Sequence, residues 1–123
     1  MTSHYDLYYT APSGKIIPVK TAKKFMDRII GLSGHKKEIY GILMESCCFT
    51  HTFFMRYPVD IIYLDKNNKV IATKRCIKPF RIVFPVRGAK RILKFPSSLN
   101  AMAFLKKGTP VELFQTKIPL VIY

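Results

Sequence analysis

The chain has 123 residues and carries 21 lysine and arginine residues against 7 aspartate and glutamate residues, a formal net charge of +14. This length is typical of one domain, here residues 1–123, and the 49% content of hydrophobic residues excludes a wholly disordered chain. The sequence has no apolar run of about 18 residues, no amino-terminal secretion signal and three cysteines, which favours a cytoplasmic protein without a membrane span.

Short apolar segments separated by turn residues predict strands along most of the chain. In chain order, the predicted strands are Tyr5–Tyr9, Ile16–Lys20, Tyr40–Met44, Cys48–Arg56, Asp60–Asp65, Val70–Ile77, Arg81–Val86, Arg91–Phe95 and Val111–Phe114. The tail at residues 115–123 ends in an apolar run, which we expect to dock on the body of the protein or on a partner.

Two stretches have the spacing of short helices instead. The first begins at a Thr21 cap and runs to about Ile30, with apolar residues at every third or fourth position. The second spans Leu99–Lys106 and is capped by Ser97 or Ser98. Strands outnumber helices too heavily for a parallel βαβ sheet. We therefore predict an α+β fold: a compact, strongly bent or barrel-like, mainly antiparallel sheet with two short helices.

The central stretch from His51 to Asp65 reads HTFFMRYPVDIIYLD. Together with Arg-Ile-Ile-Gly-Leu at 28–32, Gly-Ile-Leu-Met at 41–44 and the strand ending in proline at 89–96, it resembles the prokaryotic family called domain of unknown function 192. The resemblance covers about residues 16–114. It implies a compact domain of mixed α and β structure, and it implies no particular activity.

Two positions depart from the pattern of that family. Ser33 follows Gly-Leu where members often have methionine, and Lys94 stands where members usually have glutamate. The second departure reverses a charge. It puts in doubt, for this chain, any role that the glutamate has in other members.

Strand pairing arithmetic predicts one cluster of charged residues. A hairpin that closes at Tyr57–Val59 aligns Arg56 with Asp60, and a two-residue turn at Asn67–Asn68 aligns Asp60 with Arg75. One carboxylate between two guanidinium groups leaves an excess positive charge, which suits a phosphate or carboxylate ligand. The alternative is an ion cluster that only fixes the hairpin register.

The same pairing aligns His51 with Asp65. A histidine beside a carboxylate is the arrangement of a general base and the group that orients it. The alternative is a histidine that is hydrogen-bonded at a strand end. The three histidines lack the spacing of metal ligands, so we expect no metal and no other cofactor.

The second half of the chain is strongly basic. No acidic residue lies between Asp65 and Glu112. Such a charge attracts polyanions, which include nucleic acid, anionic lipid headgroups and acidic proteins. The alternative is a solvated surface without a specific partner.

Basic and aromatic residues alternate in the segment Lys78–Arg91. This mixture suits single-stranded nucleic acid, because cations contact phosphates and rings stack on bases. It also suits a strand whose Phe80, Ile82 and Phe84 fill the core, and this is the interpretation that we adopt.

Our first hypothesis is a binding domain that recognises an anionic ligand or partner through the predicted charge cluster and the basic second half. The second hypothesis is an enzyme of unknown reaction that uses His51 and Asp65. The third is a structural module that docks through its apolar carboxy-terminal tail. The candidate binding residues are His51, Arg56, Asp60, Arg75 and Arg87.

Overall fold

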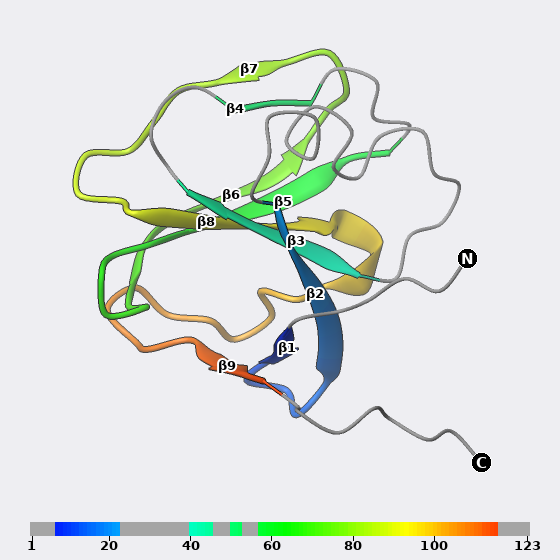
Figure 1. Cartoon of the computed structure of the whole chain (residues 1–123). Coiled ribbons are helices and arrows are strands. Elements are labelled where there is room, and N and C mark those ends of the chain that lie inside the picture. Colours follow the sequence, from blue (N-terminus) through cyan, green and yellow to red (C-terminus); the bar gives the residue numbers. More distant parts are fainter. Residues whose placement is uncertain (1–6, 23–39, 46–49, 53–56, 116–123) are drawn as a thin grey trace.

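The computed structural model describes residues 7–22, 40–45, 50–52 and 57–115. The described residues form short strands and one turn of 3₁₀ helix (Figure 1). The strands are β1 Leu7–Thr10, β2 Ile16–Ala22, β3 Gly41–Glu45, β4 Thr50–His51, β5 Val59–Leu64, β6 Val70–Ile77, β7 Ile82–Val83, β8 Arg91–Pro96 and β9 Glu112–Phe114; the 3₁₀ turn η1 is Ser97–Leu99.

Seven of these strands form one curled sheet in the order β6-β5-β8-β3-β2-β1-β9 (Figure 1). Strands β2 and β3 pair in parallel, and the other described pairs of this sheet are antiparallel. Strands β4 and β7 pair separately and lie over one face of the sheet. The strongly bent, mainly antiparallel sheet is therefore confirmed.

Both faces of the sheet are covered, and each face has its own apolar cluster. Strand β5 is buried at every position because β6 and β8 flank it and each face packs against other residues. Ile62 and Leu64 belong to the cluster that also contains Met102 and Val111. The opposite face of the sheet, which we call the β7 face, carries Val59, Ile61 and Tyr63 together with Val83 of β7 and Ala89.

The two predicted helices are not found among the described residues. The second prediction is wrong, because Asn100 and Phe104 have φ angles of 50° and 65°, which an α-helix cannot accommodate. Only η1 forms there, followed by turns, and the Ser97 hydroxyl donates to Asp60 instead of capping a helix. Thr21 and Ala22 lie within β2, and residues 23–30 of the first predicted helix fall outside the described residues.

The hairpin between β5 and β6 closes with a three-residue loop, where the sequence predicts two residues. The Asp65 amide donates to the Lys69 carbonyl at 3.0 Å, and the Asn68 amide donates to the Asp65 carbonyl at 3.1 Å. Asn68 has a φ of 62°, the conformation that ends such a loop. As a result, Leu64 pairs with Val70, one residue earlier than predicted.

Close packing of β3 against β8 requires glycine at position 41. A Cβ atom there would lie 2.4 Å and 2.6 Å from two ring carbons of Phe95 and 3.0 Å from the Lys94 carbonyl oxygen. The Phe95 ring is fully buried, so it has little room to move away.

We expect Gly41→Ala to lower the free energy of unfolding by about 1–3 kcal/mol through overpacking, as measured by urea denaturation. Phe95→Leu makes room for the new methyl group, so the double variant should lose less stability than the two single changes added together. Additive losses would contradict a direct clash between the two positions.

Candidate functional site

Asp60, the centre of the predicted charge cluster, is buried and has two described donors. Its Oδ1 atom accepts a hydrogen bond from the Cys76 amide at 2.9 Å and another from the Ser97 hydroxyl at 2.7 Å. Arg75 of β6 is exposed, and its Nη2 atom donates to the Met102 carbonyl at 3.1 Å. Asp60 therefore links β5, β6 and η1, which is a structural use of its carboxylate.

Arg56, the second cation predicted beside Asp60, falls outside the described residues. The clustering of Arg56, Asp60 and Arg75 therefore stays a prediction. Among the described residues, the hydrogen bonds of Asp60 and Arg75 lead to different partners.

The predicted alignment of His51 with Asp65 is wrong. His51 pairs with Ile82 of β7, and both edges of β5 are already occupied by β6 and β8. The Asp65 carboxylate instead stabilises the turn, where its Oδ1 accepts from the amides of Asn67 at 2.7 Å and Lys69 at 3.0 Å. The hydrogen bond from Lys69 is the main cause that lowers the pKa of this carboxyl group.

The connection between β6 and β8, residues 78–90, carries exposed cationic and large apolar side chains. We call it the basic–aromatic loop. Its four cationic residues are exposed, and the loop contains no acidic residue. These cations are Lys78, Arg81, Arg87 and Lys90. Arg87, a candidate binding residue from the sequence, thus lies in the exposed turn before Gly88.

Three large apolar side chains of this loop point to solvent, and our prediction that they fill the core is wrong. Phe80 is 66% exposed, Ile82 is 57% exposed and Phe84 is 65% exposed. Of the apolar side chains at positions 80–84, that of Val83 is buried, and it packs in the apolar cluster on the β7 face. Successive residues of a strand point to opposite sides, so the burial of Val83 turns Ile82 and Phe84 outward.

Thr52, which is fully buried, fixes the start of the loop through both its backbone and its side chain. Its hydroxyl donates to the Lys78 carbonyl at 2.7 Å and accepts from the Arg81 amide at 2.9 Å. Its amide donates to the Arg81 carbonyl at 2.8 Å, and its carbonyl accepts from the Phe80 amide at 3.0 Å. These four bonds secure Phe80 in a left-handed conformation with a φ of 63°, which bulky residues rarely adopt.

Further contacts fix the rest of the loop to the sheet. The Tyr63 hydroxyl reaches the Phe84 carbonyl at 3.4 Å, and the Lys90 amide donates to the Leu64 carbonyl at 2.8 Å. Burial in the same region raises the pKa of Tyr63, so its hydroxyl stays protonated as a donor. The loop is thus attached near its start, at Phe84 and at its end, while its rings and cations remain exposed.

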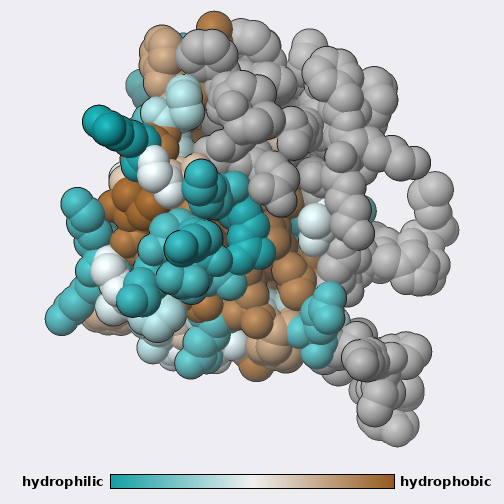
Figure 2. All heavy atoms as spheres, turned by 60° about the vertical axis from the view of Figure 1, so that its left-hand side comes forward, coloured by the Kyte–Doolittle hydropathy of each residue, from teal (hydrophilic) through white to brown (hydrophobic). Residues whose placement is uncertain are grey.

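Figure 2 brings forward the side of the molecule on which this connection passes from β7 to β8 in Figure 1. Hydrophobic and hydrophilic side chains adjoin one another on this face. Such a surface offers apolar contact and positive charge to the same partner.

Lys94 is a second unusual feature, because it is a cation in the central strand β8. It is 4% exposed, and it lies opposite Ile42 of β3 and Ile61 of β5. Burial lowers the pKa of its amine to about 8. The sequence revealed Lys94 only as a departure from a family pattern, since burial within a sheet depends on pairing that the local sequence does not show.

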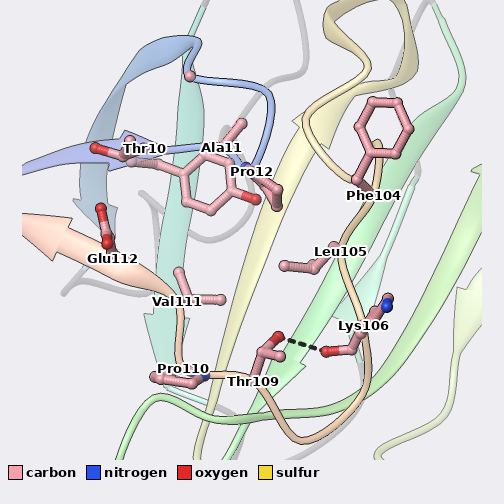
Figure 3. A pocket seen from close by; sticks show the side chains of 12 residues that line it. Thr10, Ala11, Pro12, Phe104, Leu105, Lys106, Thr109, Pro110, Val111 and Glu112 are labelled. Carbon is pink, nitrogen blue, oxygen red and sulfur yellow. Dashed lines mark hydrogen bonds between the residues drawn. The ribbon is translucent and has the colours of Figure 1, made fainter.

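A pocket of about 440 Å³ lies on the other face of the sheet, where Leu105 and Val111 point toward each other across it (Figure 3). The Tyr9 hydroxyl in its wall donates to the Ala101 carbonyl at 2.8 Å, and burial raises the pKa of that tyrosine to about 12. The Thr109 hydroxyl donates to the Lys106 carbonyl at 2.5 Å. Two polar side chains of the pocket are thus engaged within the protein.

The described residues contain no group of three or more histidine, cysteine, aspartate or glutamate side chains arranged to hold a metal ion. Within the same described ranges, no helix is long and apolar enough to cross a membrane.

Comparison with known proteins identifies relatives over most of the chain. The family DUF192, described as "Uncharacterized ACR", matches residues 8–113. A UPF0127 protein of Pyrococcus furiosus is 30% identical over 101 residues, which cover 78% of this chain and 86% of the relative. A UPF0127 protein of Thermococcus sibiricus is 41% identical over 84 residues, which cover 63% of this chain and 54% of the relative.

Two solved structures have the same fold. A protein of unknown function from Novosphingobium aromaticivorans matches with a TM-score of 0.69 and 17% identity, over 87% of this chain and 83% of that protein. A "putative transcription regulator" from Sinorhizobium meliloti matches with a TM-score of 0.70 and 14% identity, over 94% of this chain and 98% of that protein. At these identities the likeness concerns the fold alone.

We expect Thr52→Val to lower the free energy of unfolding by about 1–3 kcal/mol, because the Arg81 amide and the Lys78 carbonyl lose their side-chain partner. Thr52→Ser keeps the hydroxyl and is the matched control, with a clearly smaller loss. Urea denaturation of the three proteins provides the comparison. Equal losses in the two variants would show that the hydroxyl does not stabilise the loop.

The lowered pKa of Lys94 predicts that the free energy of unfolding rises with pH. Between pH 8 and the usual lysine value of 10.5, the unfolded chain binds the proton that the folded chain has released, so the free energy of unfolding increases through this window. Lys94→Met removes the amine that titrates in this window, so it should flatten the pH dependence, as measured by urea denaturation from pH 7 to 10.

Lys106→Met is the control for this experiment, because Lys106 is exposed. It should change neither the stability at pH 7 nor the slope. A Lys94→Met protein with the slope of the wild type would disprove the assignment of the pH dependence to Lys94.

Proposed function

The chain belongs to the uncharacterized family DUF192, and we propose that it binds polyanions through its basic–aromatic loop. One observation carries the proposal: four cationic and three large apolar side chains of one connection are all exposed, and no acidic residue lies among them. Apolar side chains normally leave water on folding, so a loop that exposes three of them beside cations offers contact area to a charged partner.

The charge of the surrounding chain supports the same partner. The net charge is +14, and the sequence has no acid from residue 66 to residue 111. The basic–aromatic loop lies in the middle of this stretch. The electric field of these positive charges concentrates polyanions near the surface and accelerates their association.

The spread of the cations favours a polymer over a small anion. The cationic residues occupy positions from 78 to 90, at both ends and in the middle of the loop. A single exposed ion pair contributes little to binding, whereas a polymer that contacts several cations releases several counterions at once. The proposal therefore places recognition at this loop and not at the Asp60 edge, where the carboxylate is buried.

Nucleic acid is the first polyanion to test. The Sinorhizobium meliloti protein that shares the fold is described as a "putative transcription regulator". That description concerns the other protein, and here it adds a reason to include nucleic acid beside heparin among the probes.

We expect binding to heparin and to nucleic acid at low salt that weakens steeply as salt is raised. The variant Arg81→Gln/Arg87→Gln should lower the affinity and make the salt dependence shallower by roughly one to two units of log–log slope. Fluorescence anisotropy at 50 mM and 200 mM salt measures both quantities.

Lys106→Gln/Lys107→Gln is the matched control, because it removes two exposed cations outside the loop. This control has the same net charge as the loop variant. An equal loss in both variants would mean that net charge acts without a defined surface, and absence of heparin binding at low salt would refute the proposal.

A further inference from the structure

We propose that the basic–aromatic loop is a stacking platform selective for single-stranded nucleic acid, with Phe80 and Phe84 as the stacking rings. This inference rests on the proposed polyanion binding and adds the class of polymer. It is carried by three properties of the loop, which are the exposure of the rings, the fixed backbone that carries them and the placement of cations beside them.

Both phenylalanine side chains are largely exposed. Phe80 is 66% exposed and Phe84 is 65% exposed, so each offers accessible ring surface to a planar base. Stacking of bases on aromatic rings is a large and sequence-tolerant part of the affinity of proteins for single strands. In a duplex the bases stack on one another inside the helix. Its phosphates can therefore contact the cations of the loop, but its bases cannot stack on the two phenylalanine rings.

The backbone that carries the two rings is fixed before any ligand binds. Phe80 has a left-handed backbone that costs conformational energy, and hydrogen bonds to the buried Thr52 maintain it. Phe84 follows the buried Val83, and its carbonyl accepts from Tyr63. Binding to rings on a fixed backbone orders less of the chain, so such positioning raises affinity.

The cations are interspersed with the rings along the chain. Lys78 precedes Phe80, Arg81 follows it, and Arg87 comes after Phe84. A single strand alternates phosphates and bases in the same way, so each polymer unit can give one charge contact and one stacking contact.

The distance between the rings indicates the length of strand that the platform takes. Phe80 and Phe84 are four residues apart, so their Cα atoms are separated by at most about 13–14 Å. Bases in a stacked strand rise by about 3.4 Å, so this upper limit corresponds to about four base steps. Including the flanking cations, we expect a site of about four to six nucleotides.

The experiment measures affinities of the full chain for fluorescent oligothymidylates of two to twelve nucleotides, for a duplex of equal charge, and for heparin. Phe80→Ala and Phe84→Ala should each weaken binding of the single strand by about 5- to 100-fold and leave heparin affinity within about twofold. Affinity should level off with length beyond about six nucleotides. The wild type should bind the single strand more tightly than the duplex.

Ile82→Ala is the comparison within the loop, because Ile82 is an exposed apolar residue of the same loop that has no ring. Stacking predicts that this variant loses clearly less single-strand affinity than Phe80→Ala or Phe84→Ala. Phe104→Ala is the control, because it removes an 81% exposed ring outside the loop and should have no effect. Circular dichroism verifies that the variants are folded, which we expect since all four side chains lie in solvent.

The outcomes separate the two proposals. Heparin binding without preference for a single strand, or equal losses for Ile82→Ala and the two phenylalanine variants, would overturn the stacking platform and leave polyanion binding intact. Binding to vesicles of phosphatidylserine that depends on Phe80, Ile82 and Phe84 alike would identify a lipid surface and also overturn it. Absence of heparin binding would refute the proposed function itself.

Discussion

The conformation of the turn that begins the basic–aromatic loop depends on one buried residue, Thr52. A fully buried hydroxyl must find hydrogen-bond partners, and that of Thr52 finds the Lys78 carbonyl and the Arg81 amide. The backbone of Thr52 adds two more bonds to the same turn. The turn therefore bends where Phe80 must adopt a left-handed conformation, and the ring of that residue is directed to solvent. Thr52 thus determines the conformation of a turn that lies far from it in the sequence.

The sequence predicted the parts of the fold that depend on nearby residues. The strands at Val70–Ile77 and near Arg91 were found, as was the hairpin at Asn68, because alternation and turn residues are local signals. The sequence did not predict that β5 pairs with β8, about thirty residues further along the chain. This pairing occupies the edge of β5 that the expected hairpin between β4 and β5 would use. The second helix failed for a local reason, since left-handed residues interrupt a segment whose composition suits a helix.

The sequence predicts which types of residue make up the candidate site, but it does not predict how they are arranged in space. Charge alone pointed to the second half of the chain, and alternation of rings and cations pointed to residues 78–91. Period-two alternation shows that one side of a strand differs from the other, and it does not show which side is buried. Here the single Val83 takes the inward position, and the larger side chains face out. Lys94 shows the converse, since a charged residue that looks exposed in the sequence lies within the central sheet.

The folded loop holds the backbone of Phe80 and Phe84 in place before a partner arrives. Amide hydrogen exchange of Phe80 and Arg81, followed by NMR on the free protein, tests it most directly, because these two amides donate to Thr52. We predict that both amides exchange slowly, with protection close to that of the neighbouring sheet amides. Exchange at the rate of an unstructured peptide would contradict this, because the backbone that carries the rings would then have no fixed position.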